Sequence, residues 1–233
     1  MTPLPPLKCI SSMATRQLLG ALCRQWTEES GQTVALESVG GVDAARRIAA
    51  GEHFDVAVLA SDALDELLES GRVGRITSIA LSGVAVAARS GTAPPISTVA
   101  LLLETLRSSR AIGYSTGPSG KALLAMLAQW GVLDSLQSRL VQAPPGVPVG
   151  ALIAQGTVDL GFQQHSELIH CEGIALLGPM PPGAEISTFF AAAPCVAGRQ
   201  QQAEAFIAYL ASASCVPTIR AEGMQPTTLR NFS

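Results

Sequence analysis

The 233-residue sequence has few charged residues, few aromatic residues and only two lysines, Lys8 and Lys121. Charged residues make up 14% of the chain and the formal net charge is −3, so no basic surface is expected that would bind a nucleic-acid backbone. No apolar stretch is long enough to cross a bilayer. Because 48% of the residues are hydrophobic, the chain can bury a large core. We therefore expect a globular protein with no nucleic-acid partner and no stable membrane association.

Cysteine and histidine are also scarce, and their spacing suggests neither disulfides nor metal ligands. An odd number of cysteines without metal-type spacing predicts reduced, buried thiols at Cys9, Cys23, Cys171, Cys195 and Cys215. The histidines His53 and His170 have no companion at metal-ligand spacing, so we predict no metal site and no cofactor.

The N-terminal segment, Met1 to Lys8, lacks a basic region followed by an apolar one. As written, it predicts a cytoplasmic protein. If an export signal had been removed, the location would be periplasmic, and an ABC permease would then become a possible partner.

Strand and helix patterns alternate along the chain, which predicts α/β architecture with parallel strands. We expect two lobes, each a mixed sheet flanked by helices. Lobe 1 comprises residues 1–82 and the returning segment 191–233, and lobe 2 comprises residues 83–190. The hinge is predicted to consist of two Val- and Ala-rich strands, Ser82–Arg89 and Ile186–Cys195.

The remaining predicted elements have short polar connections between them. The predicted strands are 7–10, 33–38, 55–60, 111–114, 158–162 and 174–177. The predicted helices include one that ends at Gly31, two that begin at the N-caps Asp43 and Asp62, and others at 121–130, 147–155, 201–211 and 216–222.

Four segments rich in hydroxyl, glycine or amide groups are predicted to follow strand ends, where ligands bind in open α/β sheets. Glycine allows close backbone approach, and the first turn of a helix favours an anion. The segments are Ser11–Thr15, Val39–Val42, Ser115–Gly120 and Phe162–Ser166. Pro118–Lys121 lacks the spacing of a nucleotide-binding P-loop, so we exclude triphosphate binding.

Two stretches carry a resemblance to a known family. The run Ala44–Gly51 followed by Phe54–Asp62 resembles the second helix and third strand of molybdate-type substrate-binding proteins of ABC transporters. The run Gly150–Gly156 followed by Val158–Phe162 is similar to a segment of their second lobe. The resemblance extends in order and spacing over nearly the whole chain, and it implies the two-lobed type II periplasmic-binding-protein fold with an anion held between the lobes.

In that family serine hydroxyls, backbone amides and a tyrosine hold the oxyanion. The resemblance matches these positions to Ala14, Gly41, Ala60, Ser119, Pro148 and Gln164. Two hydroxyl positions and the tyrosine are therefore absent, which favours an organic di- or tricarboxylate over molybdate, because an amide and a cation suit carboxylates. The predicted ligand-binding residues are Ser11, Ser12, Thr15, Gly40, Gly41, Ala60, Ser119, Gly120, Lys121 and Gln164.

Three functions remain open. The first is a substrate-binding-protein-like receptor for a small-molecule anion. The second is a cofactor-independent isomerase that shifts a double bond in an unsaturated polycarboxylate, as in aconitate-isomerase-like members of the fold, with Ser12, Lys121 and His165 as catalytic candidates. The third is an effector sensor similar to that of LysR-type regulators. The alternative for Lys121 and His165 is that both are solvated side chains at helix starts.

Overall fold

The computed structural model describes residues 5–90 and 95–227. The chain forms two compact units. Unit 1 contains residues 1–81 and 189–233, and unit 2 contains residues 82–188. The predicted boundaries were 82/83 and 190/191. Part of the N-terminal segment used to predict the location, residues 1–4, lies outside the described residues.

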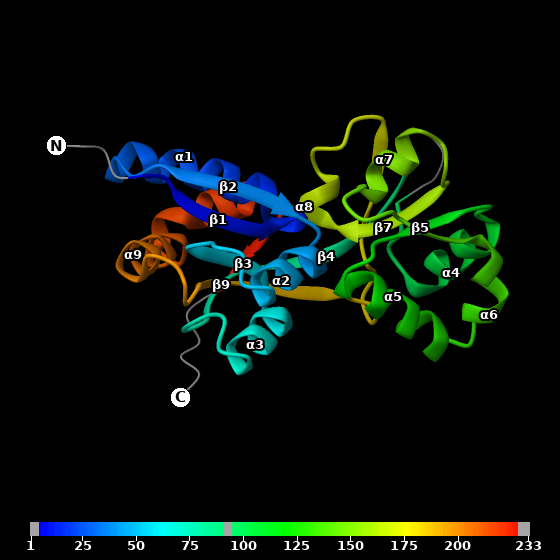
Figure 1. The fold of residues 1–233 in the computed structure, drawn as a ribbon. Helices are drawn as coiled ribbons and strands as arrows, with labels where there is room; N and C mark the ends of the chain where they lie inside the picture. The colour runs from blue at the N-terminus through cyan, green and yellow to red at the C-terminus, as the bar shows by residue number, and fades with distance from the viewer. Residues whose placement is uncertain (1–4, 91–94, 228–233) are drawn as a thin grey trace. The chain divides into compact units, whose positions relative to one another are not determined.

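Unit 1 is a sheet with helices on both faces (Figure 1). Its strands have the order β2-β1-β3-β9, with β1 parallel to β2 and β3, and β9 antiparallel to β3. The strands are β1 Leu7–Ser12, β2 Val34–Val39, β3 Val56–Ala60, β9 Ser187–Pro194 and β10 Gln225–Pro226. The helices are η1 Met13–Thr15, α1 Arg16–Ser30, α2 Gly41–Ala49, α3 Ser61–Glu69, α9 Gln200–Leu210, η3 Ala213–Cys215 and α10 Val216–Ala221.

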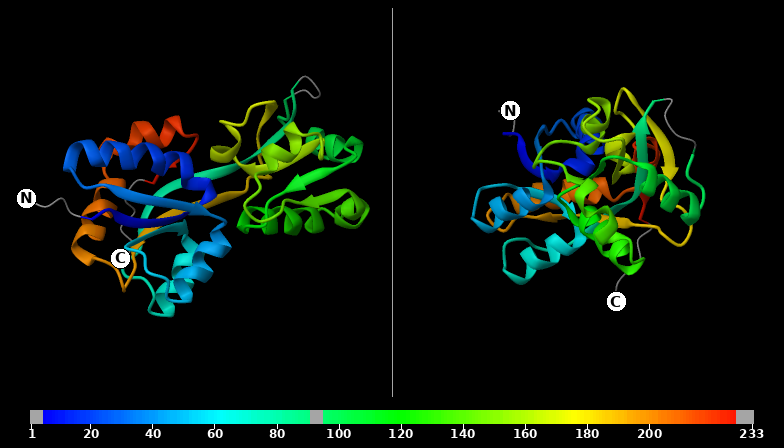
Figure 2. Two further views of the ribbon diagram at one scale, coloured as in Figure 1. Left: turned by 45° about the horizontal axis from the view of Figure 1, so that its top comes forward. Right: turned by 90° about the vertical axis from the view of Figure 1, so that its right-hand side faces the viewer.

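The alternation of side chains along the strands of unit 1 builds two cores. One face packs against α1, α9 and α10 and includes Leu18, Leu22 and Phe206. The other face packs against α2 and α3 and includes Ile48 and Leu64. Figure 2 shows α1 on one side of these strands and α2 and α3 on the other. Helices α2 and α3 therefore cover a single face of the sheet.

Unit 2 repeats this plan. Its strands have the order β8-β4-β7-β5-β6, with β5 parallel to β6 and β7, and β4 antiparallel to β7 and β8. The strands are β4 Thr77–Arg89, β5 Ile112–Tyr114, β6 Leu140–Gln142, β7 Leu160–Gln164 and β8 Ile174–Pro179. The helices are α4 Val99–Ser108, α5 Pro118–Gln129, α6 Leu133–Leu136, η2 Gln137–Arg139, α7 Val149–Ala154 and α8 His165–Leu168.

Two strands, β4 and β9, run from one unit into the other, as predicted for the hinge segments. The mixed α/β architecture predicted from the sequence is confirmed. Helix α4 and strand β6 were not among the predicted elements. The thiols of Cys9, Cys23, Cys195 and Cys215 are free and buried, whereas Cys171 is only partly buried.

Several predicted element boundaries were wrong at the ends that concern function. Helix α2 begins at Gly41, two residues before the predicted cap Asp43. Helix α3 begins at Ser61, one residue before the predicted cap Asp62. Their N-caps are Gly40 and Ala60, because these residues keep a strand-like ψ of 134° and 141° and the helix follows without a loop.

Two further boundaries place polar residues in regular structure. Strand β1 extends through Ser12 and β7 extends through Gln164, beyond the predicted ends, because neighbouring strands pair with their last residues. Helix α5 begins at Pro118, three residues before the predicted start, because proline is well suited to the first turn of a helix.

Candidate functional site

The carboxyl ends of three parallel strands in unit 1 lie at one edge of its sheet. Ser12, the last residue of β1, pairs with Val39 at the end of β2. On the other side, Ser11 pairs with Val58, two residues before the end of β3. Each strand leads directly into a helix, so the starts of η1, α2 and α3 meet at this edge.

Ser12 presents a buried hydroxyl at this edge. The residue is 7% exposed, and its Oγ has no hydrogen-bond partner among the described residues. Ser12 lies on the strand face of Ile10, which packs in the core with α2 and α3. A Cβ placed on Gly41 would lie 3.5 Å from the Ser12 Cβ, so the start of α2 is close to this side chain. A buried hydroxyl without a hydrogen-bond partner costs free energy, which suggests that a bound ligand supplies the missing hydrogen bond.

The N-termini of α2 and α3 add backbone donors. Neither N-cap, Gly40 or Ala60, supplies a side-chain acceptor for the first-turn N–H groups. Such groups attract an anion by hydrogen bonding and by the helix dipole. One acidic residue in each first turn, Asp43 and Asp62, opposes this attraction, although Asp43 forms an ion pair with Arg46.

The other hydroxyls of the first segment bond within unit 1. Ser11 Oγ lies 2.8 Å from Ser38 Oγ, and Thr15 Oγ1 donates to the Ser12 carbonyl oxygen at 3.1 Å. Ala14, which the resemblance matched to a hydroxyl position, is buried in the core against α1. At this strand end, Ser12 is therefore the residue whose hydroxyl is available to a ligand.

In unit 2 the segment after β5 forms a tight turn into α5. Ser115 Oγ and Ser119 Oγ lie 2.9 Å apart, and Ser119 and Gly120 are buried. A Cβ on Gly120 would lie 1.8 Å from the Ser115 carbonyl oxygen, so this turn requires glycine. The next residue, Lys121, is exposed, which agrees with the alternative of a solvated side chain.

Gln164 ends the neighbouring strand β7 at the same edge of unit 2. Tyr114 pairs with Phe162 in parallel, which brings the ends of β5 and β7 together. Gln164 is 4% exposed; its Nε2 donates to Thr188 Oγ1 at 2.8 Å, while its Oε1 has no partner among the described residues. His165 follows as the first residue of α8 and is partly exposed.

A titratable group beside this strand end, Glu167, was not among the predicted site residues. Burial raises the pKa of its carboxyl to about 7, although a hydrogen bond from Gln163 Nε2 at 2.8 Å partly counteracts this rise. The Gln163 Oε1 accepts a hydrogen bond from the Gly150 N–H in α7 at 3.3 Å. The four-residue spacing of Gln163 and Glu167 was the only sequence signal of this pair.

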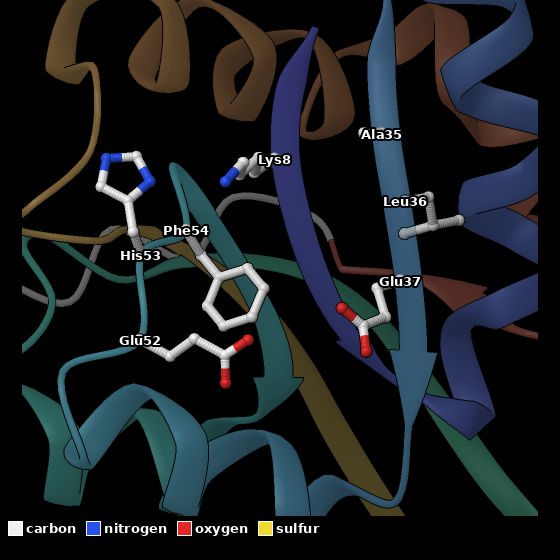
Figure 3. Close-up of a pocket in the computed structure, with 7 residues that line it drawn as sticks. All are labelled: Lys8, Ala35, Leu36, Glu37, Glu52, His53 and Phe54. Carbon is white, nitrogen blue, oxygen red and sulfur yellow. The ribbon is translucent and has the colours of Figure 1, made fainter.

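A separate hollow of about 480 Å³ lies on the α2 face of unit 1 (Figure 3). Its lining residues come from β1, β2 and the segment after α2, and they are Lys8, Ala35, Leu36, Glu37, Glu52, His53 and Phe54. Arg47 pairs with Glu37 and Glu52 and lies 5.3 Å from the centre of the Phe54 ring. None of the predicted site residues lines this hollow.

Within residues 5–90 and 95–227, no three His, Cys, Asp or Glu side chains gather as metal ligands. In the same part of the chain, no helix has both the length and the apolar character needed to cross a membrane.

Two α/β units joined by two shared strands, with helices starting at the carboxyl ends of parallel strands, define a type II periplasmic-binding-protein fold. Solved structures support this class. The periplasmic molybdate-binding protein of Azotobacter vinelandii has a TM-score of 0.82 at 21% identity and matches 95% of this chain and all of that chain. The sulfate-binding protein SubI of Mycobacterium tuberculosis H37Rv has a TM-score of 0.78 at 14% identity and matches 97% of this chain and 88% of that chain.

Sequence relatives give the family. The model of bacterial extracellular solute-binding proteins matches residues 7–225. An aconitate isomerase from a Pseudomonas species is 34% identical over 184 residues, which cover 77% of this chain and 70% of that protein. The chain belongs to the bacterial extracellular solute-binding protein family, as its resemblance to molybdate-type binding proteins implied.

Proposed function

We propose that this protein binds a small organic anion with two or three carboxylate groups. The observation that carries the proposal is the Ser12 hydroxyl, which is buried and has no partner in the described part of the chain. It lies beside the start of α2, and α2 and α3 both begin without a side-chain cap. Hydroxyl and amide donors that converge in this way suit one carboxylate group of a ligand.

A carboxylate is favoured over a tetrahedral oxyanion for two reasons. In unit 2, the Gln164 amide bonds to Thr188 at one end only, and with the amide turned by about 180° its NH₂ group would offer a directional donor to a planar carboxylate. In addition, the relative with 34% identity is named for aconitate, which is a tricarboxylate. We propose that Gly40, Gly41, Ala60, Ser119 and Gly120 contribute backbone groups to ligand binding, as the sequence predicts.

A thermal-shift panel tests the proposal. A ligand that binds only the folded protein stabilises it by about 2.7 kcal/mol at a concentration of 100 times Kd. We expect higher melting temperatures with trans-aconitate, cis-aconitate, citrate or tricarballylate than with molybdate, tungstate or sulfate. Acetate at matched ionic strength serves as the control. A shift with molybdate alone would contradict the carboxylate proposal.

A second candidate function is isomerisation of an unsaturated tricarboxylate, and the 34% identity to an aconitate isomerase is the observation that favours it. In such a reaction a base removes a proton from a CH₂ group next to a carboxylate. The double bond moves along the carbon chain, and an acid returns a proton to the carbon at its far end. No electrons are gained or lost, so the reaction requires no redox cofactor. Ser12, Lys121 and His165 are the proposed catalytic groups.

Proton NMR in D₂O tests this second function directly. Turnover predicts interconversion of cis- and trans-aconitate together with deuterium incorporation at the exchanging carbon. His165→Gln and Lys121→Met should slow the reaction more than they weaken binding. If binding occurs without interconversion or deuterium exchange, the protein is a receptor and not an isomerase.

The location and the transport partner belong to the same proposal. We propose a cytoplasmic protein, with an ABC permease as partner only for an exported form. Fractionation of the native host with an antibody against the chain would distinguish the two locations.

A further inference from the structure

The buried amide of Gln164 is held at one end only. Its Nε2 donates to Thr188 Oγ1 at 2.8 Å, and Thr188 belongs to β9 within unit 2. The Oε1 atom at the other end is buried and has no partner among the described residues. Because an unpartnered buried amide group is costly, a ligand group at this free end would explain why the arrangement is kept.

The backbone of Gln164 is fixed independently of this side-chain contact. Gln164 pairs with Val84 of β4, and it is the N-cap of α8. Ser166, two residues later, has its Oγ 3.4 Å from Ser82 Oγ. The loss of the Thr188 hydroxyl would therefore free the side-chain torsions of Gln164 without moving its backbone.

We propose that Thr188 is a positioning residue for ligand binding, because its hydroxyl orients the Gln164 amide so that the free end meets a carboxylate of the ligand. This inference rests on the proposed carboxylate-binding function. A threonine hydroxyl donates and accepts hydrogen bonds, so it bonds to either end of an amide. A carboxylate selects the orientation in which Thr188 donates to the Gln164 carbonyl oxygen and the NH₂ group faces the ligand.

Isothermal titration with trans-aconitate tests the inference in four variants. Thr188→Val keeps the shape of the side chain and removes the hydroxyl, and we expect Kd to rise about tenfold. Thr188→Ser keeps the hydroxyl, so its Kd should stay within about threefold of that of the unmodified protein. Gln164→Met should weaken binding, and the double variant Thr188→Val with Gln164→Met should bind no more weakly than Gln164→Met alone.

The double variant separates positioning from a purely structural role, because a role in packing alone would weaken binding in both backgrounds. Melting temperatures without ligand check the folding of each variant, and Thr188→Ser supplies a second test if Thr188→Val does not fold. If the unmodified protein binds no member of the carboxylate panel, the proposed function fails and the inference fails with it. If the unmodified protein binds trans-aconitate and Thr188→Val binds it equally well, the inference alone is overturned.

Discussion

The buried carboxylate of Asp55 connects three segments of unit 1, and its removal should destabilise that unit. Its side chain is 1% exposed. One oxygen accepts a hydrogen bond from the Lys8 N–H at 2.8 Å, at the start of β1. The other accepts one from the Arg199 N–H at 2.8 Å, at the start of α9. The Arg199 guanidinium completes an ion pair with Asp55 and donates to the carbonyl oxygens of Pro5 and Pro6.

The structure gives the size of the expected loss. Asp55→Ala leaves a partly buried guanidinium and two backbone N–H groups without their acceptor, which corresponds to about 3 to 5 kcal/mol. The pKa supplies a second measure. Burial alone would raise the pKa of Asp55, but hydrogen bonds from Arg199 and Lys8 outweigh it and lower the pKa from 3.8 to about 2. This difference corresponds to about 2.5 kcal/mol at neutral pH.

The sign of the pH dependence follows from the lowered pKa. The ionised carboxylate stabilises the folded state above pH 3.8, and this contribution disappears as the pH falls through about 2. Asp55→Ala should therefore cost most at pH 7 and progressively less in acid. The difference between the mutant and the unmodified protein should shrink by about 2.5 kcal/mol over this range.

Urea unfolding followed by tryptophan fluorescence measures this loss in unit 1 alone. The two tryptophans lie in different units, Trp26 in α1 and Trp130 at the end of α5, so Trp130→Phe leaves a reporter of unit 1. Asp43→Ala, which breaks an exposed pair with Arg46, is the matched control and should cost less than about 0.5 kcal/mol. A loss below about 1 kcal/mol for Asp55→Ala at pH 7 would refute the reasoning.

Three other predictions concern unit 2 and the thiols. Because burial raises the pKa of Glu167 to about 7, its stabilising contribution is complete below pH 4.5 and is lost as the pH rises through 7. Glu167→Gln should abolish this loss of about 2 kcal/mol in unfolding experiments at pH 5 and 8, and equal pH dependence in both proteins would contradict it. Gly120→Ala should weaken trans-aconitate binding at least tenfold in titrations, because the added Cβ would overlap the Ser115 carbonyl oxygen; unchanged affinity would count against a role for this turn. Burial raises the pKa of the thiols of Cys9, Cys23, Cys171 and Cys195. A thiol reagent at pH 8 should therefore react slowly with the partly buried Cys171 and far more slowly with the buried Cys9, Cys23 and Cys195, and rapid reaction of several of these thiols in the folded protein would contradict the structure.

Local sequence patterns were sufficient to predict most of the fold. The apolar residues of α1, with Leu18, Leu19 and Leu22 buried, follow helical spacing and end at Gly31, whose φ of 72° favours glycine. Strands such as β3, which is buried along nearly its whole length, stand out as short apolar runs. These signals depend on neighbouring residues in sequence, so they could be read without the structure.

The bonding state of the site residues is set by contacts between segments that are distant in sequence, and local sequence patterns do not predict such contacts. Ser12 and Gln164 were predicted to lie in loops, but pairing with neighbouring strands extends β1 and β7 to include them. Ser11 and Ser12 are adjacent serines that the sequence does not distinguish, but the Ser11 hydroxyl bonds to Ser38 on the neighbouring strand. Thr188 was not a candidate because its contact with Gln164 joins residues separated by 24 positions. The choice between a bonded and an available hydroxyl therefore depends on tertiary structure.

The most direct test of the central claim is the affinity of Ser12→Ala for trans-aconitate, measured by isothermal titration beside the unmodified protein. A hydrogen bond from this hydroxyl to a carboxylate predicts a Kd that is about 10- to 100-fold higher in the variant. Ser108→Ala, which removes an exposed hydroxyl at the end of α4, should bind like the unmodified protein. Unchanged affinity in Ser12→Ala, or tighter binding of molybdate than of trans-aconitate by the unmodified protein, would contradict the account.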